Sequence, residues 1–244
     1  RLFWWLKSRW KIKKICQWSW KVSVGNEFLA QFARQYCDQV VIIPTVVDTK
    51  IHSNHQPTAK GQRPIANSQP PTANSQHLTI GWTGSHSTLF YLDSIVPVLQ
   101  ELETQCDFNF LVIANRDPQL PLKNYQFIKW NKDSEIIDLQ KIDIGLMPLE
   151  DTEWAKGKCG FKLIQYGALG IPSVASPVGV NSTIVTHGIN GYLADTPKAW
   201  KDALIELLTN PSKRNEMGRK ARKVVQEKYS IAAVEKDFLD LFSA

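Results

Sequence analysis

The amino-acid sequence predicts an α/β protein built on a doubly wound, mostly parallel sheet. From residue 78 to the C-terminus, short apolar runs of the kind found in buried strands alternate with segments in which apolar residues recur at helical spacing. Glycine-bearing turns follow several of these runs. Strands and helices that alternate in this way form a parallel sheet with helices on both faces, and ligands bind beyond the carboxyl ends of its strands.

Six apolar runs are expected to form the strands of this sheet: LTIGWTG (78–84), FNFLVIAN (108–115), YQFIKW (125–130), DIGLMPL (143–149), PSVAS (172–176) and GYLAD (191–195). Helices are expected between and after them, at residues 89–105, 134–142, 161–169, 197–210, 212–229 and 232–244. Ser134 is the expected N-cap of the second of these helices, and Gly170 is expected to end the third.

A smaller strand–helix–strand unit is expected before this sheet. The segment VSVGNEFLAQFARQYCDQVVIIPT begins with a short strand, continues in a helix with Asn26 as its N-cap, and ends in a buried strand over residues 40–45. Composition then changes sharply, because residues 50–77 are polar, contain several prolines and repeat the motif ANSQ. Such a segment buries too little apolar surface to order itself, so a flexible linker is predicted.

Charge is concentrated at the N-terminus. The chain of 244 residues has a net charge of +6, but residues 1–24 hold seven Lys or Arg and no acid, and the remaining 22 basic and 23 acidic residues nearly cancel. The same segment carries five tryptophans, a mixture typical of a helix at a membrane surface or of a face that packs on another domain. Both readings stay open. No apolar run is long enough to span a bilayer, and no signal peptide is recognisable.

Several function classes are disfavoured by composition. The four cysteines (Cys16, Cys37, Cys106 and Cys159) lie far apart without a CxxC pair, which argues against a disulfide framework or a zinc site. Basic residues are confined to one segment without an RNA-binding or helix-turn-helix pattern, so no nucleic-acid partner is expected. The expected location is the cytoplasm, with peripheral contact at the inner face of the cell membrane through residues 1–21.

Two glycine-bearing loops fall at expected carboxyl ends of strands. GWTGSHST (81–88) places Gly84 and Ser85 before a helix, and GKCGFK (157–162) places Lys158, Gly160 and Lys162 at a helix start. A lysine there opposes the helix dipole unless an anion shares the site, which suits a phosphate. The alternative for each loop is an ordinary turn with a solvated lysine or a serine cap. Neither GxGxxG nor a P-loop is present.

The run FKLIQYGALGIPSVASPVGVNSTIVTHGINGYL resembles the donor-site region of the retaining GT-B glycosyltransferases of family 4, the glycosyl transferases group 1. In that family a KLxEY helix, a GxP turn and a VG…EIV…G.NG segment follow one another. The resemblance extends over residues 78–229, and VGNEFLAQFA…VVIIPTVVDT resembles the end of the family's N-terminal domain. It implies a Rossmann-like fold, the C-terminal half of a GT-B fold.

The resemblance also implies a domain organisation. Residues 1–49 correspond to a remnant of the N-terminal acceptor domain, and residues 50–77 to the linker. Residues 78–230 correspond to the nucleotide-sugar-binding domain, and residues 231–244 to a helix that crosses back to the N-terminal domain.

Carried over by position, the resemblance assigns donor diphosphate binding to Gly84, Ser85, Lys158, Gly160, Phe161 and Lys162. Gln165 stands where the family has the ribose-binding second glutamate of its E-x7-E motif, and Gly157 stands in place of the first, with Glu153 nearby. Trp130 and Asn131 are the implied base contacts. No catalytic residue is assigned, no metal ligand is implied, and the nucleotide-sugar is a substrate rather than a cofactor.

The expected function is transfer of a sugar from a nucleotide-diphosphate donor to a glycan or lipid-linked acceptor in cell-surface polysaccharide or glycolipid assembly. This chain would supply the donor-binding half of a retaining glycosyltransferase, as a fragment or a split subunit. The alternative is a non-catalytic nucleotide-binding or regulatory module derived from such an enzyme, because the first glutamate is replaced at Gly157.

Overall fold

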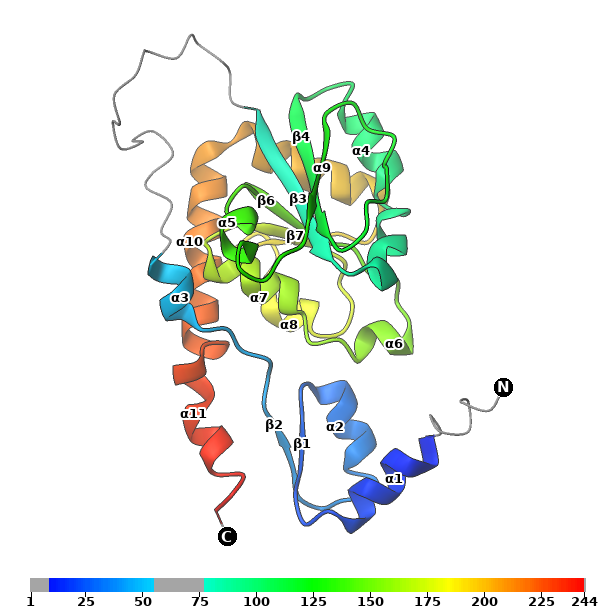
Figure 1. The fold of residues 1–244 in the computed structure, drawn as a ribbon, viewed down its shortest axis with the longest axis vertical. Coiled ribbons are helices and arrows are strands. Elements are labelled where there is room, and N and C mark those ends of the chain that lie inside the picture. Colours follow the sequence, from blue (N-terminus) through cyan, green and yellow to red (C-terminus); the bar gives the residue numbers. More distant parts are fainter. Residues whose placement is uncertain (1–8, 55–76, 244) are drawn as a thin grey trace.

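The structure is a computed structural model, and it describes residues 9–54 and 77–243 (Figure 1). Its larger part is a sheet of six strands in which every neighbouring pair is parallel. The strands are β3 (Leu78–Gly84), β4 (Phe108–Ala114), β5 (Tyr125–Lys129), β6 (Ile144–Met147), β7 (Ser173–Ala175) and β8 (Tyr192–Leu193). Their order, β5-β4-β3-β6-β7-β8, is that of a doubly wound Rossmann-like sheet, as predicted.

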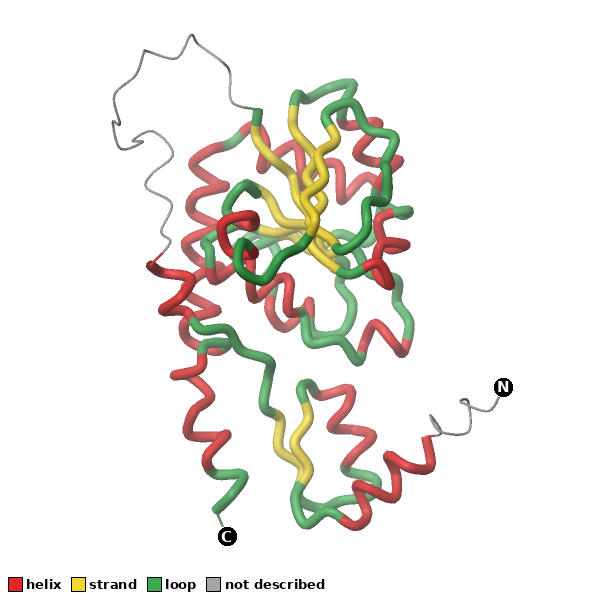
Figure 2. The backbone as a smooth tube through the Cα atoms, viewed as in Figure 1, coloured by secondary structure: helices red, strands yellow, loops and turns green. Residues whose placement is uncertain are grey.

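Helices cover both faces of this sheet (Figure 2). On one face α4 (Val96–Leu102) and α9 (Pro197–Thr209) pack together, and on the other lie α5 (Glu135–Leu139), α7 (Phe161–Ala168) and α10 (Pro211–Lys228). Residues of β4 alternate between the two cores, because successive strand side chains point to opposite faces. Phe110 and Val112 belong to the first core, and Leu111 and Ile113 to the second.

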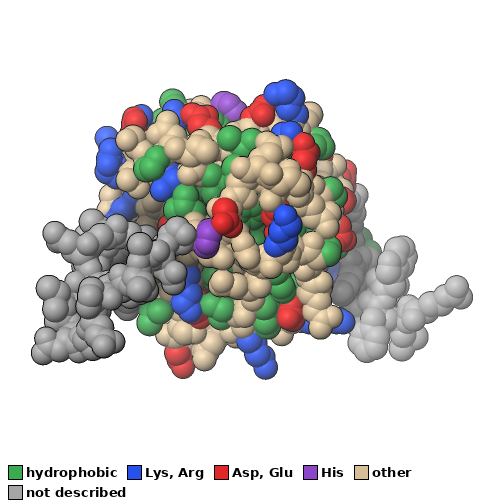
Figure 3. Space-filling model, turned by 90° about the horizontal axis from the view of Figure 1, so that it is seen from above, with side chains coloured by type: hydrophobic (Ala, Val, Ile, Leu, Met, Phe, Trp, Pro, Cys, Tyr) green, Lys and Arg blue, Asp and Glu red, His purple; other side chains and the backbone are tan. Residues whose placement is uncertain are grey.

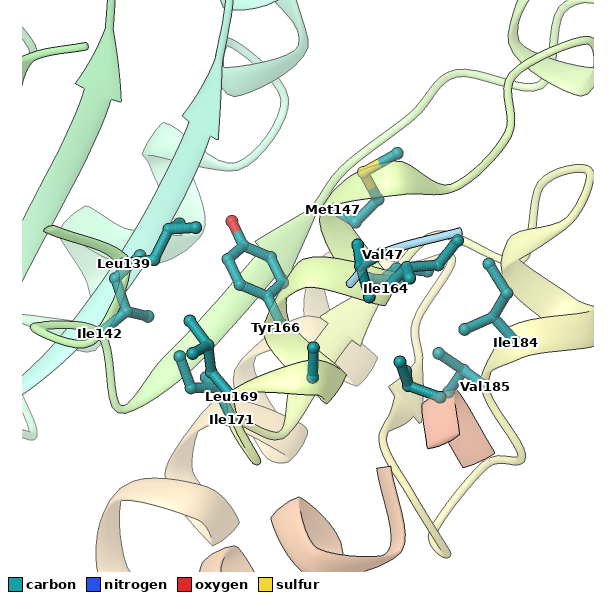
Figure 4. Packing of buried hydrophobic residues seen from close by; sticks show 14 of the residues in the cluster. Val47, Leu139, Ile142, Met147, Ile164, Tyr166, Leu169, Ile171, Ile184 and Val185 are labelled. Atoms are coloured by element: carbon teal, nitrogen blue, oxygen red, sulfur yellow. The ribbon is translucent and has the colours of Figure 1, made fainter. Parts of the chain in front are cut away.

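The seam between β3 and β6 is where strand order reverses. Gly81 of β3 and Gly145 of β6 are register partners there. A Cβ atom at Gly81 would lie 2.4 Å from Ile142, and one at Gly145 would lie 2.4 Å from the ring of Tyr166. Both positions therefore exclude any side chain. Tyr166, fully buried on α7, fills this space among the labelled side chains of the second core (Figure 4).

The hydroxyl of Tyr166 completes the seam. β3 and β6 pair only through residues 80–81 and 144–145, and beyond them the backbone N–H of Thr83 donates to the Tyr166 hydroxyl oxygen at 3.2 Å. The hydroxyl in turn donates to the carbonyl of Leu146 at 3.5 Å. Burial raises the pKa of Tyr166, so the hydroxyl stays neutral and keeps its proton.

One predicted helix is divided. Residues 89–105 form a 3₁₀ helix, η2 (His86–Leu92), followed by α4, rather than one continuous helix. Pro97 lies in the first turn of α4, where its missing N–H costs nothing, and a continuous helix through it would lose a hydrogen bond. Two further short helices, α6 (Glu153–Lys156) and α8 (Asn181–Ile184), follow β6 and β7.

The N-terminal part forms a separate small layer. It contains α1 (Arg9–Trp18), β1 (Val22–Val24), α2 (Glu27–Ala33) and β2 (Val40–Ile42), and β1 and β2 are parallel. Asn26 caps α2 as predicted, because its side chain accepts the N–H of Leu29. Among the described residues of this layer, Cys16, Ala33 and Cys37 form a small buried cluster.

The predicted linker begins differently in the structure. Residues up to 54 continue as α3 (Thr49–Asn54). Asp48 accounts for this helix, since its carboxylate accepts the N–H of Lys50 at 2.8 Å and its carbonyl accepts from His52. The remaining linker positions up to residue 76 lie outside the described residues.

The C-terminal helix α11 (Ile231–Leu239) runs beside the N-terminal part (Figure 1). Val47 makes a parallel bridge with Ser230, and its N–H donates to the carbonyl of Tyr229 at 3.0 Å. Lys21 donates to the carbonyl of Asp240 at 3.0 Å. The chain therefore contacts the N-terminal part just before this helix and just after it.

The surface at the amino ends of the strands is mixed in charge. Figure 3 shows Lys, Arg, Asp and Glu side chains interspersed on this face rather than gathered by sign. Across residues 9–54 and 77–243, every helix is too short or too polar to cross a membrane.

The Tyr166 hydroxyl provides a test of the seam. We expect Tyr166→Phe to lower the free energy of unfolding by about 1–3 kcal/mol, because the buried Thr83 N–H loses its acceptor. Urea unfolding measures this change. The matched control is Tyr192→Phe, whose hydroxyl donates to the exposed Glu206 at 2.6 Å and should cost less than about 1 kcal/mol. Equal losses in the two variants would contradict a special role for the seam.

Candidate functional site

A cavity of about 520 Å³ opens at the carboxyl ends of the central strands. It is lined by Thr83, Gly84 and Ser85 after β3, by Asn115 after β4, and by Met147 at the end of β6. Strand order reverses between β3 and β6, which is where doubly wound sheets bind their ligands. The loop before α7 and the first turns of that helix close the cavity on one side through residues 158–162 and Gln165.

Backbone N–H groups are presented at the start of α7. Gly160 is its N-cap, with φ +68°, and a Cβ atom there would also lie 2.4 Å from Ile184. This left-handed conformation directs the chain into the helix without a capping side chain. The N–H groups of residues 159–162 donate to no acceptor in the part of the chain that the structure describes. Consecutive N–H groups of this kind form an anion-binding concavity.

Lys162 adds a cation to this concavity. Its Nζ lies 5.1 Å from the centroid of the Trp82 ring, which holds the side chain across the end of β3. Burial, together with the charge of Lys158, lowers the pKa of Lys162 from 10.5 to about 8. A buried ammonium has lost part of its hydration shell. An anion bound beside it stabilises its charged form.

Lys158 is the second cation of the cavity. Its Nζ lies 5.4 Å from the ring centroid of Tyr91 and 5.8 Å from that of Trp154. The resemblance assigned Lys158 to the same site as Lys162, and the structure places both at the cavity wall. The electrostatic coupling between them shows that the two charges share one environment.

The loop after β3 reaches the cavity, and the packing around Gly84 explains why a glycine stands there. Its φ is not positive, and a Cβ atom there would lie 2.4 Å from the Trp82 ring and 2.9 Å from Oγ1 of Thr88. Close packing therefore excludes a side chain. Ser85 is the N-cap of η2, and its hydroxyl pairs with that of Ser87 at 2.8 Å rather than with the helix backbone.

Gln165 lies one helical turn beyond the anion concavity and faces the cavity. It is 4% exposed, and its amide makes no hydrogen bond to the residues that the structure describes. Its amide faces the cavity and can donate to or accept from a ligand there. The position predicted for a ribose contact is therefore available for hydroxyl groups.

The two predicted base contacts are placed differently. Trp130 lines the cavity, and its indole N–H donates to Glu135 Oε1 at 2.9 Å. Asn131 is not among the lining residues, because its side-chain oxygen turns back to accept the N–H of Asp133 at 3.0 Å. The tryptophan can stack on a planar ring, whereas the asparagine stabilises the turn that follows it.

Sequence reasoning missed several polar residues of the cavity, among them Asn115 and Glu135. Asn115 accepts the N–H of His86 at 2.6 Å and so ties the loop after β4 to the loop after β3. Glu135 begins α5 and holds Trp130. Both follow the carboxyl end of a strand, so that position in the pattern could have identified them.

The structure also shows the surroundings of Gly157, which stands in place of the family's first glutamate, and of the nearby Glu153. Gly157 is the C-cap of α6, and the atoms nearest to a Cβ there lie at 3.5 Å and beyond, so the space would admit a side chain. Glu153 is the first residue of α6 and does not line the cavity.

Asn181 is fully buried at the start of α8 and donates to the carbonyl of Ser176 at 3.0 Å, while its side-chain oxygen is unpaired. It supports a turn and is not a cavity residue.

Within residues 9–54 and 77–243, no three His, Cys, Asp or Glu side chains gather closely enough to hold a metal ion.

Fold and site together define a Rossmann-like α/β protein with a candidate anion site at the reversal of strand order. The sequence model of the family described as Glycosyl transferases group 1 matches residues 115–224, from the end of β4 into α10. No match was found among curated proteins.

Solved glycosyltransferase structures share this fold. Sucrose-phosphate synthase from Thermosynechococcus elongatus is 16% identical with a TM-score of 0.71, over 94% of this chain and 59% of that one. TarM of S. aureus, in complex with Fondaparinux, α-GlcNAc-glycerol and UDP, is 17% identical with a TM-score of 0.71, over 98% and 47%. HepE of Anabaena in complex with UDP is 12% identical with a TM-score of 0.68, over 92% and 64%.

These likenesses establish the GT-B type of fold for this chain. The chain spans between 47% and 64% of the length of the three structures.

The coupling between the two lysines can be measured directly. We expect Lys158→Met to raise the pKa of Lys162 from about 8 towards 10.5, because a like charge beside a buried ammonium disfavours protonation. NMR titration of the lysine side chains follows this pKa, and Lys162→Met assigns the resonance. An unchanged pKa in Lys158→Met would show that the two charges do not share a site.

Proposed function

We propose that this chain is the donor-binding half of a retaining, family 4 glycosyltransferase that takes its sugar from a nucleoside-diphosphate donor. The observation that carries the proposal is the anion concavity, in which the N–H groups of residues 159–162 lie beside Lys158 and Lys162. Four backbone donors and two cations in one cavity match the charge and the oxygen-rich surface of a diphosphate.

The remaining cavity residues fit the rest of a nucleotide. Trp130 offers a ring on which a base can stack, Glu135 a carboxylate that accepts from N–H or O–H groups, and Gln165 an unpaired amide for ribose hydroxyls. The titles of two solved neighbours name UDP as their ligand, so UDP is the first nucleotide to test.

The proposed chemistry is electrostatic. When the bond between the sugar and the diphosphate breaks, negative charge develops on the leaving phosphate, and pre-oriented N–H groups and lysines stabilise that charge without reorganising. Lys162 is suited to this role because its ammonium is partly desolvated before the donor binds. We propose that these groups act without a metal cofactor.

The acceptor is proposed to be a glycan or a lipid-linked sugar of the cell envelope. It would approach from the N-terminal part, because the carboxyl ends of the strands point towards α2 and β1 (Figure 1). In this proposal residues 1–49 contribute the acceptor side and residues 78–230 the donor side, and the rest of the acceptor site lies on segments outside this chain.

A second function, a nucleotide-binding module without turnover, is favoured by one observation. Gly157 supplies no carboxylate at the position where the resemblance expects one, and Glu153 does not line the cavity. Such a module would bind the nucleotide through the same lysines. Hydrolysis of a UDP-sugar in the presence of an acceptor-domain protein distinguishes the two functions, since only the enzyme releases UDP.

The diphosphate assignment can be tested with Lys162→Met, which retains the apolar stem beside Trp82. We expect UDP affinity to fall by about 1.5–3 kcal/mol, roughly 10- to 150-fold, because a charge-assisted contact is lost. Isothermal titration calorimetry with UDP, GDP and ADP measures the affinity and identifies the base.

The matched control for this test is Lys198→Met. Lys198 lies in the first turn of α9, pairs with Asp202 and is remote from the cavity. We expect the Lys198→Met variant to bind UDP with the affinity of the wild type. A folded wild-type chain that binds none of the three nucleotides would refute the donor-site assignment.

We also propose that α1 contacts an anionic membrane surface from the cytoplasmic side. Its exposed face carries Trp10, Ile15 and Trp18, and Nζ of Lys14 lies 5.2 Å and 5.8 Å from the two indole rings. Tryptophans flanked by lysines, without an acidic residue in the helix, suit the headgroup region of such a bilayer.

Liposome sedimentation tests this contact. Trp10→Ser combined with Trp18→Ser should lower binding to phosphatidylglycerol vesicles at least tenfold, because the interfacial anchors are lost. Trp154→Ser removes an equally exposed tryptophan, 77% against 78% for Trp18, and should not change binding. Wild-type protein that stays in the supernatant would favour the alternative, in which this face packs on another domain.

A further inference from the structure

A residue of the N-terminal part reaches the loop that leads into the anion concavity. Asn26, the N-cap of α2, is 4% exposed. Its side-chain NH₂ donates to the carbonyl of Lys156 at 3.3 Å and to that of Lys158 at 3.1 Å, while its side-chain oxygen accepts the N–H of Leu29. One amide therefore links the end of β1 and the start of α2 to a turn 130 residues away in sequence.

The turn at residues 156–158 is held from a second side by Gly179. The backbone there has φ +55°, and a Cβ atom would lie 2.9 Å from Cα and 3.0 Å from the carbonyl oxygen of Lys156. The turn is thus enclosed between Asn26 and the loop after β7. Asn26 contributes the polar contacts, because two carbonyls that would otherwise be unpaired receive their hydrogen bonds from it.

Holding the carbonyl of Lys158 also orients the next N–H group. The peptide bond is planar and trans, so the carbonyl of Lys158 and the N–H of Cys159 point in opposite directions from the same plane. Asn26 binds that carbonyl, and the N–H of Cys159 is thereby turned to the other side of the chain, where Cys159 lines the cavity. Cys159 provides the first of the four free N–H groups.

We propose that Asn26 is a positioning residue that couples the N-terminal part of the chain to the diphosphate site. The proposal rests on the proposed function of that site. When α2 lies against the turn, the two hydrogen bonds from Asn26 orient the Lys158–Cys159 peptide for an anion. When α2 moves away, this peptide is free to rotate and the concavity loses a donor. Nucleotide affinity therefore depends on a contact that is made outside the cavity.

Asn26→Ser separates this role from helix capping. Serine is a good N-cap, so α2 keeps its first-turn acceptor, but its short hydroxyl does not reach two carbonyls. We expect UDP affinity, measured by calorimetry on the whole chain, to fall 5- to 30-fold. The isosteric Asn26→Asp retains the cap and the volume but has no N–H to donate, and it should weaken binding at least as much.

The matched control is Asn210→Ser. Asn210 caps α10 in the same way, accepting the N–H of Lys213 at 3.0 Å, and its NH₂ donates to no described residue. We expect its UDP affinity to equal that of the wild type. A wild-type affinity in both Asn26 variants would overturn the proposal.

Hydrogen exchange provides a readout that does not depend on a nucleotide. The N–H of Lys158 donates to Ala155 at 3.0 Å and that of Gly157 donates to Glu153 at 3.2 Å, so both amides are protected by the geometry of the turn. We expect Asn26→Ser to speed their exchange at least tenfold while the amides of α10 are unaffected. If the wild-type chain binds no nucleotide, the proposed function fails. Unchanged exchange of these two amides in Asn26→Ser would overturn the proposed role of Asn26, whether or not a nucleotide binds.

Discussion

The close approach of two strands at Gly81 and Gly145 is the constraint on which the rest of the structure depends. These glycines face each other across the β3–β6 seam, and Ile142 and Tyr166 occupy the space that their side chains would take. Tyr166 belongs to α7, so the seam determines how closely that helix packs on the sheet. Its hydroxyl pairs the Thr83 N–H at the point where the strands separate. The opening beyond that point is the candidate site.

The same helix therefore carries the structural and the functional groups. Tyr166 anchors α7 in the core, while Lys162 and Gln165, on the earlier turns, line the cavity. A lysine near a helix N-terminus opposes the helix dipole, and burial adds to that cost. Burial and the charge of Lys158 lower the pKa of Lys162. The tight packing of α7 at the seam offsets this cost, and an anion in the concavity would remove it.

The N-terminal part depends on contacts more than on a core of its own. Among its described residues, Cys16, Ala33 and Cys37 form the buried cluster, and this cluster is too small to stabilise an independent unit. It is attached through the Val47–Ser230 bridge, through Lys21 on α11, and through Asn26 on the turn before α7. The contact through Asn26 reaches Lys158, which lines the cavity, so movement of this part changes the surroundings of the site.

The sequence by itself determined the order and type of most elements, because buried strands and amphipathic helices leave a local periodic pattern. It also identified the lysine-bearing loop at residues 157–162, since glycine spacing and a misplaced cation are local features. Only the tertiary structure decided which polar residues share the cavity. Asn115 and Glu135 enter it because β4 lies next to β3 and β5 lies next to β4, whereas Asn131 turns back to its own loop. The reach of Asn26 to Lys158 was likewise invisible in the sequence, because a contact between residues 132 apart depends on how two separately predicted parts pack.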